Sequence, residues 1–254
     1  PRELNEASGL ALSRRNPGIL WVHNDDGAPI LFALDTLGNL RGHLRIVGVD
    51  NDDWEDIAVA PCGNAFCLYI GAIGDNRQRG TDRAIHVVPE PLLTDSTAQP
   101  VATVRYRFPD QAHDTEALFV VNEKIYLITK GRSGPITLFA VPDAGAEERV
   151  TLRPLQTLTA GLVQLPDMVT AAATAPDQKH VLVRTYSALQ IYTFANERLE
   201  PATQTSGYDL QNLHEFQGEG ADITADGVVY LVSEKGLGDE APPLSRVVCN
   251  LSAN

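Results

Sequence analysis

Three glutamates recur at one position of an internal repeat, and this recurrence is the first sign of chemistry in the chain. When the repeat units are aligned, Glu55, Glu116 and Glu219 share a position that Ser8 and Thr170 occupy in the other two units. Two residues earlier, the equivalent residues are Glu6, Asp53, Asp114, Met168 and Gln217. Carboxylates that gather at one place repel one another, so they must be protonated, paired with a cation or bound to a metal ion.

A second set of polar residues follows the second apolar run of each unit. Its members are 23–26 (HNDD), 74–77 (GDNR), 130–132 (KGR), 184–186 (RTY) and 234–235 (EK). In a propeller, residues before the first strand and residues after the second strand reach the same end of the central channel. We therefore expect both sets to meet at this end, which we call the mouth.

Oxygen ligands at the mouth favour calcium, because calcium accepts about six to eight oxygens in flexible geometry. Histidine and cysteine are scarce there, which disfavours zinc and copper. The predicted calcium ligands are Glu55, Glu116, Glu219, Asn24, Asp53 and Asp75. A metal-bound water could then attack a small ester, lactone or phosphoester. The predicted catalytic residues are His113, His23 and Glu116.

Two other interpretations use the same residues. In the first, Lys130, Arg184 and Lys235 pair with the glutamates, and the protein is a non-enzymatic module that binds a sugar, a peptide or a partner protein. In the second, two of the carboxylates act as acid and base on a glycoside. Free carboxylates favour an enzyme, whereas complete pairing favours a binding module.

A small molecule or a carbohydrate is the expected ligand of the mouth. The predicted ligand-binding residues are Trp54, Lys130, Arg184, Tyr186 and Lys235. Trp54 precedes Glu55 and is a candidate platform for stacking a sugar. Trp21 aligns with three tyrosines of other units, so we expect it to pack in the core.

Five repeats predict the elements that position these residues. The first runs are 9–12, 57–60, 118–121, 172–175 and 221–224. The second runs are 20–22, 68–70, 125–127, 181–183 and 229–231, with an aromatic middle residue in four of five. The third runs are 30–34, 84–88, 136–141, 189–194 and 244–248, and outer strands are expected at 40–47, 101–108 and 150–158.

Short, evenly spaced runs separated by turn residues predict an all-β, five-bladed β-propeller that forms a single domain. The expected blades span about 6–48, 53–108, 114–158, 168–205 and 217–254. The last unit ends after its third run. Either the N-terminal residues close the ring or the outer strand is absent there.

Cys62 and Cys67 flank the turn-forming stretch 63–66, so a hairpin would bring the two thiols together. We predict a disulfide between them, and hence an oxidising, secreted or periplasmic location. No second Cys or His pair at metal spacing accompanies them, which argues against zinc. Cys249 lies in an apolar run and is expected in the core.

The charge balance excludes one class of partner. The 254 residues contain 33 Asp and Glu against 20 Lys and Arg, a net charge of −13. This field repels a phosphate backbone, so we expect no nucleic-acid partner. No apolar stretch reaches the length of a membrane-spanning helix, so we expect no membrane insertion. The N-terminus lacks the pattern of a signal peptide, so we expect a mature or trimmed form. We also expect a monomer.

Several motifs resemble those of a widespread group of secreted bacterial β-propeller proteins. They are 20–27 (LWVHNDDG), 53–58 (DWEDIA), 68–76 (LYIGAIGDN), 113–118 (HDTEAL), 169–184 and 217–234. The resemblance covers essentially the whole chain and implies a propeller fold and export, without implying a reaction. In fold alone, the chain is also similar to calcium-dependent lactonase and phosphotriesterase propellers and to five-bladed arabinanase-like glycosidases.

Overall fold

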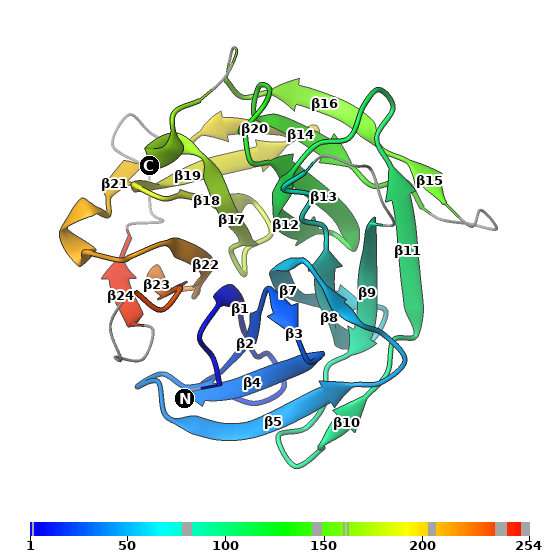
Figure 1. Cartoon of the computed structure of the whole chain (residues 1–254), viewed down its shortest axis with the longest axis vertical. Helices are drawn as coiled ribbons and strands as arrows, with labels where there is room; N and C mark the ends of the chain where they lie inside the picture. The colour runs from blue at the N-terminus through cyan, green and yellow to red at the C-terminus, as the bar shows by residue number, and fades with distance from the viewer. Residues whose placement is uncertain are drawn as a thin grey trace.

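The computed structural model describes residues 1, 3–77, 83–143, 149–159, 161, 163–202, 207–236 and 243–249. Five antiparallel sheets surround a central axis, and their first strands meet at the centre (Figure 1). The expected five-bladed β-propeller is therefore confirmed. The last expected blade extends to residue 254, of which 250–254 lie outside the described residues.

The first three blades each contain four consecutive antiparallel strands. Blade 1 contains β1 (Ala7–Leu12), β2 (Ile19–Asn24), β4 (Ile30–Asp35) and β5 (Leu40–Ile46). Blade 2 contains β7 (Trp54–Cys62), β8 (Ala65–Ala72), β9 (Arg83–Pro89) and β11 (Ala102–Arg107). Blade 3 contains β12 (Thr115–Val121), β13 (Lys124–Thr129), β14 (Thr137–Ala140) and β16 (Arg153–Thr157).

The last two blades differ at their outer edges. Blade 4 contains β17 (Val169–Thr174), β18 (His180–Thr185), β19 (Ala188–Ala195) and β20 (Arg198–Pro201). A short strand, β21 (Gly207–Asp209), also pairs with β19. Blade 5 contains β22 (Gly218–Ile223), β23 (Val228–Ser233) and β24 (Leu244–Val248), so its described part has three strands.

Short additional strands link neighbouring blades. β10 (Thr97–Ala98) pairs in parallel with β5, and β15 (Val150–Thr151) pairs in parallel with β11. These segments cover sheet edges that would otherwise leave backbone groups unpaired. Two further strands, β3 (Asp26–Gly27) and β6 (Asn51–Asp52), form a separate ribbon. Two 3₁₀ turns, η1 (Leu165–Asp167) and η2 (Gln211–Leu213), precede β17 and β22.

The core lies between the blades, because each sheet packs its apolar faces against its neighbours. The aromatic residues in the middle of the second strands pack there as expected. Trp21, Tyr69 and Tyr126 are all buried. Tyr126 stacks on Phe119 with ring centroids 5.1 Å apart. The aligned aromatics are therefore structural.

Two buried aspartates join first strands of different blades. Asp56 Oδ2 accepts backbone hydrogen bonds from Leu118 of β12 at 2.8 Å and from Ala172 of β17 at 3.1 Å. Asp222 Oδ2 accepts one from Leu12 of β1 at 2.6 Å. Asp56 therefore ties blades 2, 3 and 4 together, and Asp222 ties blade 5 to blade 1.

The predicted disulfide is confirmed. Cys62 and Cys67 are bonded across the β7–β8 hairpin, with their Cα atoms 5.8 Å apart. Cys249 is a buried free thiol, as expected. The disulfide is compatible with an extracellular or periplasmic protein. Within the described ranges, no helix has the length and apolar character needed to cross a membrane.

Candidate functional site at the channel mouth

All five first strands carry a bulge at the equivalent place. The register of β7 against β8 shifts between Trp54 and Asp56, so Glu55 is an extra residue without an opposite partner. The same shift surrounds the other four members of the aligned position, Ser8, Glu116, Thr170 and Glu219. Bulges redirect a side chain out of the regular alternation of a strand. We call these five residues the bulge ring.

The bulge ring is almost completely buried. Glu55, Glu116 and Glu219 are 6%, 2% and 4% exposed. The two hydroxyl residues of the bulge ring form hydrogen bonds with the next blade. Ser8 Oγ donates to the backbone oxygen of Glu55 at 2.7 Å, and Thr170 Oγ1 donates to that of Glu219 at 3.2 Å.

Asp53 and Glu55 form a carboxyl pair that reaches the surface of the mouth. The side chain of Asp53 is 28% exposed. Both carboxyl groups lie against Gly74, where a Cβ atom would be 2.1 Å from Glu55 Oε1 and 2.6 Å from Asp53 Cγ. Asp53 has a φ of 62°, in the left-handed region that non-glycine residues seldom adopt.

Burial raises the pKa of both members of this pair. The pKa of Glu55 lies well above its ordinary value because of burial first and the negative charges of Glu116 and Asp53 second. Burial also raises the pKa of Asp53, against the opposing effect of Arg83. Two carboxyl groups held side by side repel each other when both are ionised, and this repulsion favours the protonated form of one of them.

Among the glutamates of the bulge ring, Glu116 forms an ion pair with a lysine. Lys130 Nζ donates to Glu116 Oε1 at 2.7 Å, and Lys130 and Glu116 are 4% and 2% exposed at their side chains. Burial raises the pKa of Glu116 to about 7, although Lys130 opposes this shift. Lys130 Nζ also lies 5.7 Å from the centre of the Tyr186 ring. The sequence interpretation in which Lys130 pairs with a glutamate thus applies to Glu116.

Glu219 has an amide neighbour in place of a cation. Gln217 Nε2 donates to Glu219 Oε1 at 2.7 Å and to Glu234 Oε1 at 2.6 Å. Glu219 Oε2 is buried and has no hydrogen-bond partner among the described residues. Burial, followed by the charge of Glu116, raises the pKa of Glu219 to about 8. Glu219 is therefore a neutral carboxylic acid near neutral pH.

Arginines and further aspartates surround the carboxyl pair. Arg83 Nη2 lies 3.2 Å from Asp75 Oδ1 and 3.7 Å from Asp53 Oδ2. The backbone N–H of Asp75 donates to Asp114 Oδ1 at 2.9 Å, and Arg132 Nε lies 3.4 Å from Asp114 Oδ2. Asp75 and Asp114 are thereby held in ion pairs, whereas Glu55 has no cation in direct contact among the described residues.

Most of the predicted calcium ligands have protein partners. In the part of the chain that the structure describes, no three His, Cys, Asp or Glu side chains are arranged to hold a metal ion. Lys130 contacts Glu116, Arg83 contacts Asp75, and the Asn24 amide is engaged with the backbone of Glu3 and Glu6. Calcium would have to displace these partners, and calcium binding stays a prediction.

The candidate histidines occupy two different environments. His23 has no exposed surface and packs edge-on against Trp54, with centroids 5.6 Å apart. Burial lowers the pKa of His23 to about 4, so its ring is neutral at pH 7. His113 Nε2 contacts the Asp110 carboxylate at 3.0 Å, and its ring packs 4.8 Å from Phe108. Neither histidine has a described contact with the bulge ring.

The predicted ligand-binding residues differ in whether a ligand can reach them. Trp54 has no exposed surface, so it offers no face for stacking in this conformation. Arg184 is likewise buried and donates to the backbone oxygens of Gly220 at 2.7 Å and Val232 at 2.8 Å, and it also pairs with Glu215. The backbone N–H of Lys235 donates to Asn5 O at 3.0 Å. Tyr186 lines a pocket.

Some contributors to the site had no usable signal in the sequence. Arg83 begins β9, far from the residues that follow a second strand, and nothing in its neighbourhood distinguishes it. Gly74 stands in the motif 74–77 and could have been singled out, because a glycine beside acidic residues often marks a close approach. The Asp53–Glu55 contact itself depends on the bulge.

The comparisons with known proteins support the fold. No protein family model and no curated protein matches the chain. Among solved structures, the major allergen Mala s 1 of Malassezia sympodialis has a TM-score of 0.52 at 10% identity, covering 97% of this chain and 79% of that one. A Bacteroides caccae protein of unknown function has a TM-score of 0.50 at 9% identity, covering 95% and 77%.

An enzyme is also among the similar structures. The PQQ-bound aldose sugar dehydrogenase of Streptomyces coelicolor has a TM-score of 0.49 at 11% identity, covering 96% of this chain and 94% of that one. At such identities, a structural likeness describes the arrangement of the chain and does not transfer an activity. Function must be argued from the site.

Proposed function

We propose that this propeller is a hydrolase that uses Asp53 and Glu55 as an acid–base pair to break a carbon–oxygen bond in a small uncharged ester or lactone. The observation that carries the proposal is the pair of carboxyl groups at the mouth, which both pack against Gly74. Pairs of carboxyl groups whose environments separate their proton affinities are a recurrent arrangement in acid–base catalysis.

The pair supplies both proton transfers of a hydrolysis. The ionised member takes a proton from a water molecule, whose oxygen attacks the carbonyl carbon. The protonated member gives its proton to the substrate oxygen that gains negative charge as the carbon–oxygen bond breaks. Each turnover leaves one proton on the pair, and the two carboxyl groups exchange roles.

The two carboxyl groups have different surroundings that suit this division. Asp53 is the exposed member and lies 3.7 Å from Arg83, so it makes the contact with water or substrate. Glu55 is 6% exposed and its pKa is strongly raised by burial, so it is the member that is protonated at the start of a turnover. Ser8 Oγ lies 3.3 Å from Glu55 Oε2 and orients the acid.

The surrounding charge favours a neutral substrate. The chain has a net charge of −13, and Asp25, Asp52 and Glu6 lie near the pair. An anionic substrate such as a phosphoester would be repelled on approach. We further propose that the protein works as a monomer in a secreted or periplasmic location, which the Cys62–Cys67 disulfide supports.

Kinetics with two variants of the pair test the proposal. Asp53→Asn and Glu55→Gln keep the shape of each side chain and remove its acid–base chemistry, whereas Asp52→Asn removes an exposed carboxylate next to the pair. The assay uses a panel of sugar lactones, aliphatic lactones, and 4-nitrophenyl esters and glycosides. We expect kcat to fall by about 100-fold or more in each pair variant and by less than about twofold in Asp52→Asn.

Two results would count against the hydrolase. One is unchanged turnover in Asp53→Asn and Glu55→Gln. The other is an absence of turnover by the wild-type protein across the panel, which would favour the non-enzymatic binding module.

A further inference from the structure

A pocket of about 950 Å³ lies between blades 4 and 5. It is formed by the turn η1, the residues after β18, and the segment from η2 to the start of β22. These are segments that enter first strands or leave a second strand, so the pocket opens on the same face as the mouth. Its size falls within the range of small-molecule sites. We call it the blade 4–5 pocket.

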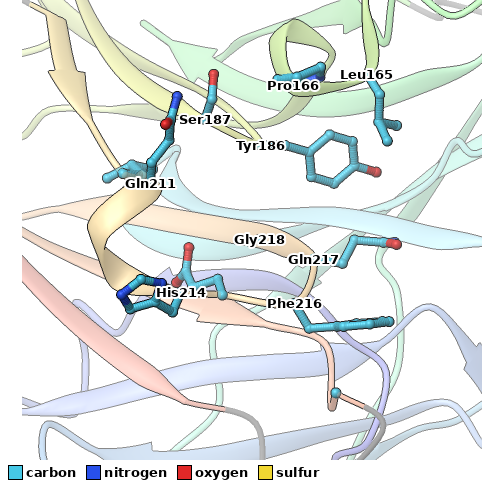
Figure 2. Close-up of a pocket in the computed structure, with 12 residues that line it drawn as sticks. Leu165, Pro166, Tyr186, Ser187, Gln211, His214, Phe216, Gln217 and Gly218 are labelled. Carbon is cyan, nitrogen blue, oxygen red and sulfur yellow. The ribbon is translucent and has the colours of Figure 1, made fainter.

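Two aromatic rings face the open space of this pocket. The ring of Tyr186 lies on one side and that of Phe216 on the other, with the side chain of Gln217 between them in this view (Figure 2). Phe216 is 58% exposed although its ring is large and apolar. An exposed aromatic beside a cavity is available for contact with a ligand.

The polar groups of the walls are mostly uncharged. Gln211, Ser187 and Gln217 contribute amides and a hydroxyl. The one acidic side chain of the lining is Glu215, and it is paired with the buried Arg184. The lining also contains His214, whose imidazole can bond to a hydroxyl group. Among the described lining residues, Glu215 is the one Asp, Glu, Lys or Arg, so the walls offer a charged ligand no fixed charge beyond this paired carboxylate.

We infer that the blade 4–5 pocket binds a neutral, hydroxylated ring of the carbohydrate class. Such a ring presents C–H faces to the aromatic walls and hydroxyl groups to the amides and to Ser187. This combination matches the alternation of Tyr186, Phe216 and glutamine side chains around the cavity. A purely apolar ligand would leave the amides without partners.

The pocket is connected to the proposed catalytic pair through the bulge ring. Gln217 lines the pocket and donates to Glu219 at 2.7 Å. Tyr186 lines it and lies beneath Lys130, which contacts Glu116, and the charge of Glu116 raises the pKa of Glu55. The inference names the substrate class of the proposed hydrolase, and turnover of a bound sugar derivative rests on that proposed function. Binding of the sugar in the pocket does not depend on it.

Binding is measured with Phe216→Ala and a matched control. The probes are glucose, galactose, mannose, xylose and arabinose with their methyl glycosides, and glucuronate and glucosamine serve as charged counterparts. Saturation-transfer NMR detects binding, and isothermal titration gives the affinity. The control is Phe66→Ala, because Phe66 is a 40% exposed phenylalanine on the β7–β8 hairpin, far along the chain from the pocket lining.

We expect at least one neutral sugar to bind wild type more tightly than its charged counterpart. Phe216→Ala should weaken that affinity by about tenfold or more because the ring loses its contact area, and Phe66→Ala should leave it within about twofold. Equal affinities of the two phenylalanine variants, tighter binding of the charged probes, or no binding of any neutral probe would each overturn the inference.

The same measurements separate this inference from the proposed function. Sugar binding that Phe216→Ala weakens, without turnover of any panel substrate, upholds the pocket and removes the hydrolase. Turnover that depends on Asp53 and Glu55 but is unaffected by Phe216→Ala upholds the hydrolase and overturns the pocket assignment.

Discussion

The carboxyl group of Asp53 lies beside that of Glu55, and both pack against the same glycine, Gly74. The two residues approach because Asp53 adopts a left-handed backbone conformation just before β7 and because Glu55 is the extra residue of the β7 bulge. The left-handed backbone at Asp53 and the glycine at position 74 both allow the two carboxyl groups to approach each other.

Gly74→Ala should disrupt the pair. A Cβ atom would stand 2.1 Å from Glu55 Oε1, closer than any tolerated contact, so the carboxyl groups must separate or the backbone must shift. We expect a loss of about 1–3 kcal/mol in the free energy of unfolding, as in other overpacked sites, measured by urea denaturation. Gly134→Ala is the control, because nothing lies within 4 Å of a Cβ at that position. Equal stability of the two variants would contradict the contact.

Stability should fall as the pH rises through the titration of Glu219. Its pKa is raised from 4.5 to about 8, so between these values the folded protein holds a proton that the unfolded chain releases. The free energy of unfolding then decreases with rising pH, by at most about 1.4 kcal/mol per pH unit for one group, and levels off above the higher value.

Glu219→Gln isolates this effect, because glutamine mimics the neutral acid. Thermal melts from pH 5 to pH 9 should show a shallower decline in Tm for Glu219→Gln than for wild type. The exposed Glu200→Gln serves as the control and should retain the wild-type slope. A slope that is the same in all three proteins would mean that Glu219 is ionised in the folded state.

Asp56→Ala should destabilise the whole propeller. The carboxylate accepts backbone hydrogen bonds from Leu118 and Ala172, so its loss leaves buried N–H groups of two other blades without a partner. We expect the free energy of unfolding to drop by about 2–4 kcal/mol in urea denaturation. Asp52→Ala is the control, because Asp52 is exposed and takes no part in these hydrogen bonds. It should change the free energy of unfolding by less than about 0.5 kcal/mol.

A thermal melt with calcium, magnesium or excess chelator tests the predicted metal site. Because Lys130 and Arg83 already contact Glu116 and Asp75, we expect the Tm to be the same within about 1 °C in all three conditions. A rise in Tm with calcium that disappears in Glu116→Gln would instead establish the calcium site that the sequence predicts.

The sequence alone determined the architecture. Five repeated pairs of apolar runs specify five blades, because each run must become a strand that buries one face against its neighbours. The aromatic residues Trp21, Tyr69 and Tyr126 and the cysteine pair around the β7–β8 turn were placed correctly from local patterns. The repeat alignment also brought Glu55, Glu116 and Glu219 to one position, since equivalent residues of a cyclic fold face a common axis.

The role of each side chain at that axis depends on how the blades pack together. Arg184 and Trp54 stand in mouth motifs, yet both are buried, because packing between blades determines exposure and local sequence does not. The Arg83–Asp75 ion pair and the pocket between Tyr186 and Phe216 join segments of different strands or blades. The raised pKa values of Asp53 and Glu55 depend on burial, and burial exists only once all five blades have closed the ring.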